Sequence, residues 1–172
     1  MKSKNQDLMK ALIVIDIQNG LTNRKDIYNI SFVIDTVNDA IKKFREIGYL
    51  LVFVQHNNKQ LISLTDKWKI DSRIDITNND LVIQKFHGNA FARTNLEAIL
   101  RKNDIAEIVI CGLVSHGCVK STCVGGLSLG FKTALLKNGH SNWDKNASEK
   151  IRSVELELEQ KGVIIIEIEN LK

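Results

Sequence analysis

Residues 107–126 read EIVICGLVSHGCVKSTCVGG, and this stretch sets the pattern for the whole chain. It begins with a run of apolar, mostly β-branched residues that stops at Gly112. Uninterrupted runs of this kind are typical of strands that are covered on both faces, as in a parallel sheet. The stretch therefore predicts a buried strand, then a turn, and then a helix whose packing face is built from small residues: Val119, Thr122, Cys123 and Gly126.

Similar apolar runs alternate with helical patterns along the rest of the chain. A helical apolar spacing covers 32–47, Thr94 and Glu97 form a capping-box pattern that predicts a short helix, and a third helix is expected over 147–160. This alternation predicts an α/β fold: a three-layer αβα sandwich with a doubly wound, mostly parallel six-stranded sheet in the Rossmann-like order 3-2-1-4-5-6. The six expected strands cover residues 11–16, 49–54, 81–85, 106–112, 130–136 and 162–168.

The composition is that of an ordinary globular protein, with 44% hydrophobic and 26% charged residues. A dispersed net charge of +4 does not indicate a nucleic-acid partner. The apolar run 11–15 is too short for a secretion signal, and no run approaches the roughly 20 residues that cross a bilayer. We expect a cytoplasmic protein with no membrane partner and one domain over residues 1–172, in which 1–9 form a flexible extension.

Polar side chains follow the predicted strands at the edge where doubly wound sheets bind their ligands. Asp16 ends the first strand and His56 lies just past the second. Lys85 ends the third strand, and Cys118 follows the fourth. Because only a thiolate attacks well, a nearby lysine and a following helix N-terminus would favour Cys118 as a nucleophile. Asp16 could take the thiol proton, so the pattern indicates acyl transfer through a covalent thioester.

The other two cysteines have a simpler interpretation. Cys111 lies inside an apolar strand and Cys123 on a helix face, so both are expected in the core. The alternative is a zinc site formed by the three cysteines and His116, but it lacks the paired spacing of zinc ligands. A disulfide between Cys118 and Cys123, more than one helical turn apart, has poor geometry.

Three segments in order resemble the isochorismatase-like cysteine hydrolases, a family that includes nicotinamidases and related amidases. ALIVIDIQNG (11–20) resembles the opening strand of that family and its D-x-Q-N turn. KFHGNAFARTNL (85–96) resembles the lysine segment, and CGLVSHGCVKSTCVGGLSLGF (111–131) resembles the nucleophile segment. The resemblance covers nearly the whole chain.

The resemblance implies a catalytic triad of Asp16 as general base, Lys85 as electrostatic partner and Cys118 as nucleophile. It also implies a cis peptide bond between Leu113 and Val114, and an oxyanion hole formed by the backbone N–H groups of Val114 and Cys118. It implies no cofactor, and a homo-oligomer, either dimer or tetramer. The side chains expected to contact the substrate are His56, Phe91 and Ser115.

Two stretches resemble a subgroup that includes streptothricin-hydrolase-like proteins: FVQHNN (53–58), and NGHSNWD (138–144), which matches a D-G-H-S-T-W-D pattern with Asn138 and Asn142 substituted. Nicotinamidases hold a metal with an Asp-x-His pair and a second histidine. Here the matching region offers only His56, and a lone histidine cannot build such a site. We therefore expect no metal and do not expect nicotinamide as the substrate.

These observations predict a cysteine-nucleophile hydrolase that cleaves a C–N bond in a small amide. The alternative is a catalytically idle copy of the same fold that acts as a binding or regulatory subunit. His116 and Asn138 keep this alternative open. The family usually has an acidic residue two positions before the cysteine, and Asn138 is a substitution in the subgroup pattern.

Overall fold

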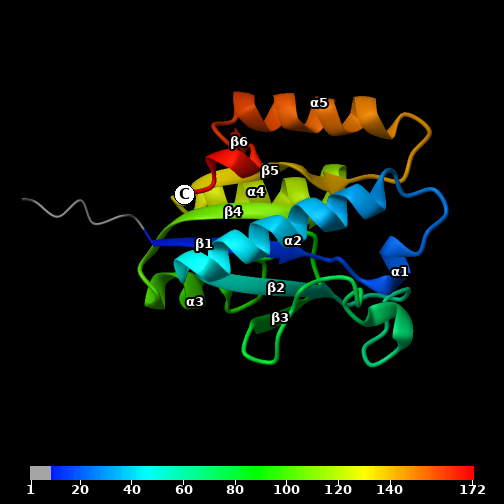
Figure 1. Cartoon of the computed structure of the whole chain (residues 1–172), viewed down its shortest axis with the longest axis horizontal. Helices are drawn as coiled ribbons and strands as arrows, with labels where there is room; N and C mark the ends of the chain where they lie inside the picture. Colours follow the sequence, from blue (N-terminus) through cyan, green and yellow to red (C-terminus); the bar gives the residue numbers. More distant parts are fainter. Residues whose placement is uncertain (1–8) are drawn as a thin grey trace, which may run out of the picture.

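The computed structural model describes residues 9–172, and these form a six-stranded sheet with the predicted order β3-β2-β1-β4-β5-β6. Every neighbouring pair of strands is parallel, so the expected doubly wound sheet is confirmed. Figure 1 shows the strands side by side with helices on both sides of them. The strands are β1 (Met9–Ile15), β2 (Leu50–His56), β3 (Leu81–Lys85), β4 (Ile105–Leu113), β5 (Lys132–Ser141) and β6 (Ile164–Ile166).

Two of these strands differ in length from the prediction. β5 continues five residues beyond the expected end at Leu136, whereas β6 contains three of the seven expected residues. β6 pairs with β5 only at residues 134–136, so the second half of β5 has no strand on that side within the described chain. The expected extension over residues 1–9 lies outside the described residues except for Met9, which is the first residue of β1.

The helices cover the two faces of the sheet, and each face has its own apolar core. On one face α2 (Ile30–Ile47) packs on β1 and β2 through residues such as Val37, Ile41 and Phe44. On the other face pack α3 (Leu96–Lys102), α4 (Lys120–Ser128) and α5 (Ala147–Gln160). Within residues 9–172, no helix is long and apolar enough to cross a membrane. The remaining elements are α1 (Asn19–Thr22) and the short helical turns Asp66–Trp68, Ser115–Val119 and Ile168–Asn170.

The helix boundaries agree closely with the ends expected from the sequence. α5 has the predicted bounds, and α2 begins two residues before the predicted start and ends at Gly48, whose φ of 84° suits glycine. The capping box at Thr94 is confirmed in part. The Thr94 hydroxyl accepts the N–H of Leu96, the first residue of α3, at 3.3 Å, and it donates a hydrogen bond to the Ala90 carbonyl.

Gly112 allows β4 to approach β1 directly beneath the residue that precedes Asp16. Its φ is 122°, and a Cβ at this position would lie 2.0 Å from the Ile15 carbonyl oxygen. A backbone atom cannot move aside as the end of a side chain can. Any larger residue at position 112 would therefore force the two strands apart or strain the backbone.

We therefore expect Gly112→Ala to lower the free energy of unfolding by about 3 kcal/mol or more, because backbone strain adds to the clash. Gly48→Ala is the matched control, since Gly48 has φ 84° but no atom within 4 Å of the added Cβ. The control should cost only about 1–2 kcal/mol. Urea unfolding measures both, and equal losses would show that the contact with Ile15 is unimportant.

Candidate active site

Four of the predicted residues meet at the carboxyl edge of the sheet. Asp16 directly follows β1, with a φ of 53°, and its N–H donates a hydrogen bond to the Val54 carbonyl in β2. His56 and Lys85 are the last residues of β2 and β3 and are partners in the strand register. One ligand atom each from Asp16, His56 and Cys118 lies within 4.8 Å of the others. The placement of these side chains follows from the rule that parallel strands end at one edge.

The Lys85 ammonium group lies at the centre of this cluster. Its Nζ is 2.7 Å from Asp16 Oδ2, 2.6 Å from His56 Nδ1 and 3.2 Å from the His87 carbonyl oxygen. An ammonium group has three N–H donors, so each donor has an acceptor. Lys85 and Asp16 are almost completely buried, at 0% and 1% exposed. The buried charge is therefore both paired and fully hydrogen-bonded, as a charge in this position requires.

His56 takes part in this cluster as a neutral hydrogen-bond acceptor. Burial of its ring and the positive charge of Lys85 lower the pKa of His56 to about 4. The imidazole is consequently neutral near pH 7, and its Nδ1 accepts a hydrogen bond from Lys85, which places the ring proton on Nε2. His56 was expected at the substrate, and the structure adds a contact with the lysine that the sequence did not indicate.

Burial also governs the ionisation of Asp16 and Cys118. Burial raises the pKa of Asp16 to about 6, although Lys85 acts in the opposite direction. Burial and the Asp16 carboxylate raise the pKa of Cys118 to about 11, outweighing Lys85. Lys85 lowers the pKa of Cys118, which is the expected direction, but burial and the Asp16 carboxylate have the larger effect. At neutral pH the site combines an ionised carboxylate with a neutral thiol.

The two carboxylate oxygens of Asp16 have different surroundings. Oδ2 contacts Lys85, whereas Oδ1 is buried and has no hydrogen-bond partner among residues 9–172. A buried carboxylate oxygen without a donor retains its full capacity to accept a proton. The arrangement therefore suits a base that takes the thiol proton during attack, rather than a resting thiolate.

Cys118 lies in a tight turn between β4 and α4. The peptide bond between Leu113 and Val114 is cis. The N–H groups on either side of Cys118, those of Gly117 and Val119, both donate to the Val114 carbonyl, at 3.0 and 3.3 Å. The turn is thus wound around one carbonyl group, and it fixes the backbone that carries the thiol.

The other two predicted substrate contacts have different surroundings. Ser115 is completely buried, and its hydroxyl donates to the Ser141 carbonyl and lies 2.8 Å from His140 Nδ1. The Ser115 side chain is therefore used within the protein, which corrects the expectation that it binds substrate. Phe91 packs on the same apolar core as Cys118, and its ring is stacked on Phe131 with a centroid distance of 5.9 Å.

The other two cysteines and His116 lie in the same segment as Cys118 but have other surroundings. Cys111 and Cys123 are both completely buried in apolar cores, as predicted. The rings of His116 and Trp143 are nearly perpendicular, with centroids 6.2 Å apart. Arg24 lies over the same Trp143 ring at 4.5 Å, so His116 belongs to a surface cluster rather than to the Lys85 centre.

Gln18 is a structural member of the site that the sequence analysis did not single out. Its side chain donates to the carbonyls of His56 and Trp68, and its Oε1 accepts the His56 N–H at 2.8 Å. These bonds tie the end of β2 to the turn that follows Asp16. The signal was present, because Gln18 follows Asp16 by two residues within the D-x-Q-N segment.

The donor atoms of Asp16, His56 and Cys118 lie close enough together to be possible metal ligands. However, the Lys85 ammonium already occupies the space between the carboxylate and the imidazole, at 2.7 and 2.6 Å from them. A metal ion bound to both groups would have to displace this charge or lie beside it, so the Lys85 ammonium competes with a metal for this position.

The family profile for the Isochorismatase domain matches residues 10–169 of the chain. The uncharacterized isochorismatase family protein YrdC of Bacillus subtilis is 28% identical over 75% of this chain and 72% of its own length. A streptothricin hydrolase of Streptomyces noursei is 25% identical over 83% of this chain, which spans about half (53%) of that relative.

Two further matches agree with these. The N-carbamoylsarcosine amidase of an Arthrobacter species is 36% identical, but only over 39% of this chain and 25% of its own length. A crystal structure of an isochorismatase family protein superposes with a TM-score of 0.87 at 27% identity, and the match covers 91% of this chain and 97% of that one. The fold and the order of its segments are therefore shared along almost the whole of the described chain.

Proposed function

The chain belongs to the isochorismatase family, and from this premise we propose that it hydrolyses a C–N bond in a small amide with Cys118 as the nucleophile. The observation that carries the proposal is the buried Asp16–Lys85 pair, which has one free carboxylate oxygen and a neutral thiol beside it. Burying two charges costs free energy, and either charge buried without the other would be strongly destabilising. Relatives named as a hydrolase and as an amidase support the same reaction class.

The first step is attack on the amide carbonyl. Asp16 Oδ1 takes the proton from Cys118 as the sulfur forms its bond to the carbonyl carbon. The carbonyl oxygen gains the electron pair and becomes an oxyanion, which the N–H groups of Val114 and Cys118 would stabilise. When the C–N bond breaks, the leaving nitrogen receives the proton from Asp16. Ammonia or an amine departs and leaves a thioester on Cys118.

The second step uses the same base. The ionised Asp16 takes a proton from a water molecule, which attacks the thioester carbonyl and forms a second oxyanion. Cleavage of the C–S bond returns the electron pair to the sulfur, which recovers its proton from Asp16. The product is a carboxylic acid, and the site returns to a carboxylate and a neutral thiol.

Lys85 and His56 have supporting roles in this proposal. The Lys85 ammonium stabilises the Asp16 carboxylate against the cost of burial, and it keeps Oδ2 occupied so that Oδ1 is the reactive oxygen. His56 holds the ammonium group through Nδ1, which leaves its Nε2–H as a donor. We propose that His56 Nε2–H and the Phe91 ring contact the substrate.

The test is a screen of small primary and secondary amides, with detection of the released amine and of the intact protein mass. A true substrate mixed rapidly and quenched in acid should add the mass of one acyl group, located on Cys118 by peptide mapping. An idle binding subunit would bind amides without releasing an amine or forming an adduct. Turnover with the adduct on another residue would contradict the proposed nucleophile.

The raised pKa of Asp16 predicts the acid side of the pH profile. The base must be ionised, so kcat/KM should fall as the pH falls through about 6 and should decrease about tenfold per pH unit below it. Circular dichroism at each pH is the control for unfolding. A midpoint near 3.8, the ordinary value of an aspartate, would contradict the assignment of Asp16 as a buried base.

A further inference from the structure

The turn that carries Cys118 is attached to the end of β5 by a buried hydroxyl group. Ser115 is the first residue of this turn, and it is completely buried. Its Oγ donates a hydrogen bond to the Ser141 carbonyl at 2.9 Å and lies 2.8 Å from His140 Nδ1. Because the hydroxyl hydrogen is directed to Ser141, His140 donates the second bond, which places a ring proton on Nδ1. His140 therefore holds Ser115 at the start of the turn.

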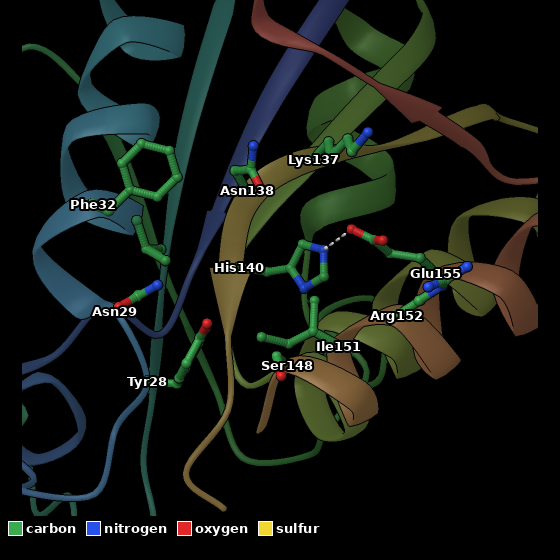
Figure 2. A pocket seen from close by; sticks show the side chains of 11 residues that line it. Tyr28, Asn29, Phe32, Lys137, Asn138, His140, Ser148, Ile151, Arg152 and Glu155 are labelled. Atoms are coloured by element: carbon green, nitrogen blue, oxygen red, sulfur yellow. Dashed lines mark ion pairs between the residues drawn. The ribbon is translucent and has the colours of Figure 1, made fainter. Parts of the chain in front are cut away.

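The His140 ring also has a partner on its other side. Figure 2 shows the ring between β5 and α5, with a dashed line to Glu155. Glu155 Oε1 lies 3.3 Å from His140 Nε2, and the two groups form an ion pair when the ring carries both protons. His140 is only 2% exposed, so little water reaches it. A buried ring with a partner beside each nitrogen is held in one orientation.

An irregularity in β5 places His140 beside the turn. Ile110 of β4 is paired with Leu135 of β5. Gly112, two residues after Ile110, is paired with His140, five residues after Leu135, so β5 contains three extra residues at this point. Asn138, with a φ of 63°, lies in this irregular part of the strand. Extra residues bend a strand and redirect its side chains, and such irregularities are common next to active sites.

Stability alone is a weak reason for this pair of polar side chains. Removing Ser115 and His140 from water costs free energy, which their hydrogen bonds offset with little net gain. Two apolar side chains of the same shape could fill the space without that cost. What the polar pair adds is a defined position for Ser115, and therefore for the backbone that runs from Val114 to Cys118.

We propose that His140 is a positioning residue for the oxyanion site. Through Ser115 it holds the start of the turn whose Val114 and Cys118 N–H groups would stabilise the oxyanion. Such donors act only when they lie within hydrogen-bond distance of the oxyanion, and a displacement of about 1 Å can cost about 100-fold in rate. His140 itself touches neither the substrate nor the thiol in this role. The role rests on the proposed hydrolase activity.

The test is steady-state kinetics on the substrate found by the amide screen. His140→Ala should lower kcat and kcat/KM equally, by about tenfold or more, because only the transition state uses the oxyanion donors. His140→Asn places an amide N–H where Nδ1–H was, and it should restore both constants to within about threefold. Glu157→Ala is the control, since it removes an exposed ion pair of α5 with Lys120 and should leave both constants unchanged.

Ser115→Ala tests the route and replaces His140→Ala if that variant does not fold. It should lower kcat to the same extent, and the double variant should be no slower than either single variant, because both act through one hydroxyl group. Losses that multiply, or a normal kcat in folded variants that have only lost stability, overturn the positioning role and leave the hydrolase activity standing. If the original protein hydrolyses no amide, the proposed function fails and the positioning role fails with it.

Discussion

Cys118→Ala should lower amide turnover by on the order of 10³-fold or more, because the variant has no atom that can form the thioester. Residual turnover would come only from substrate binding and the backbone donors around the turn. The fold should be preserved, since the Cys118 side chain is only partly buried and its turn is held by backbone bonds to Val114. Steady-state kinetics on the substrate found by the amide screen measures the effect.

The matched control is Cys123→Ala, which removes a thiol more than one helical turn further along. Cys123 is completely buried in the core that α4 shares with the sheet. This change should reduce stability modestly and leave kcat/KM within about twofold, since the thiol is remote from the reacting atoms. Unchanged turnover in Cys118→Ala would reject the covalent mechanism. Equal losses in both variants would indicate that the effect comes from packing.

Much of the fold follows from the apolar runs alone. A strand covered on both faces must be apolar throughout, so the runs that became β1 and β4 were recognisable without any partner. Their parallel arrangement then sends Asp16, His56 and Lys85 to one edge, whatever the loops do. The site could therefore be located from the sequence, because its position depends on strand direction and not on side-chain contacts.

The ionisation of that site could not be predicted in the same way. The sequence indicated that Lys85 would favour the thiolate of Cys118, but it contains no measure of how much water reaches either group. Once Cys118 is partly buried beside the Asp16 carboxylate, both effects oppose ionisation and exceed the influence of Lys85. The balance of burial and charge could not be predicted, because it is settled only when residues distant in sequence pack together.

The prediction for Ser115 failed because a hydroxyl group has several possible partners. The sequence indicated a ligand for Ser115, but in the structure its hydroxyl bonds to groups in β5 that lie 25 and 26 residues away. A tertiary contact replaced the expected one because a buried hydroxyl must be satisfied by the nearest partner.

The Asp16–Lys85 pair gives the second large effect. Asp16→Asn leaves the Lys85 ammonium buried without its carboxylate, and Lys85→Met leaves Asp16 without its cation. Each single change should lower the free energy of unfolding by about 3–5 kcal/mol, because a buried charge is left uncompensated. Each should also reduce kcat/KM by on the order of 10³-fold, since the first removes the base and the second raises the pKa of Asp16 further.

The double variant Asp16→Asn, Lys85→Met separates these two effects. With neither charge buried, stability should return to within about 2 kcal/mol of the original protein, whereas turnover should stay as low as in the single variants. Urea unfolding of all four proteins gives the coupling energy.

The exposed pair Glu97–Arg101, with oxygen and nitrogen 3.6 Å apart, is the control cycle and should show coupling of about 0.5 kcal/mol or less. Recovery of stability without activity would mean that the buried pair serves the reaction and not the fold. If the double variant is as unstable as the two single losses combined, the charges are not coupled, and the central role assigned to Lys85 fails.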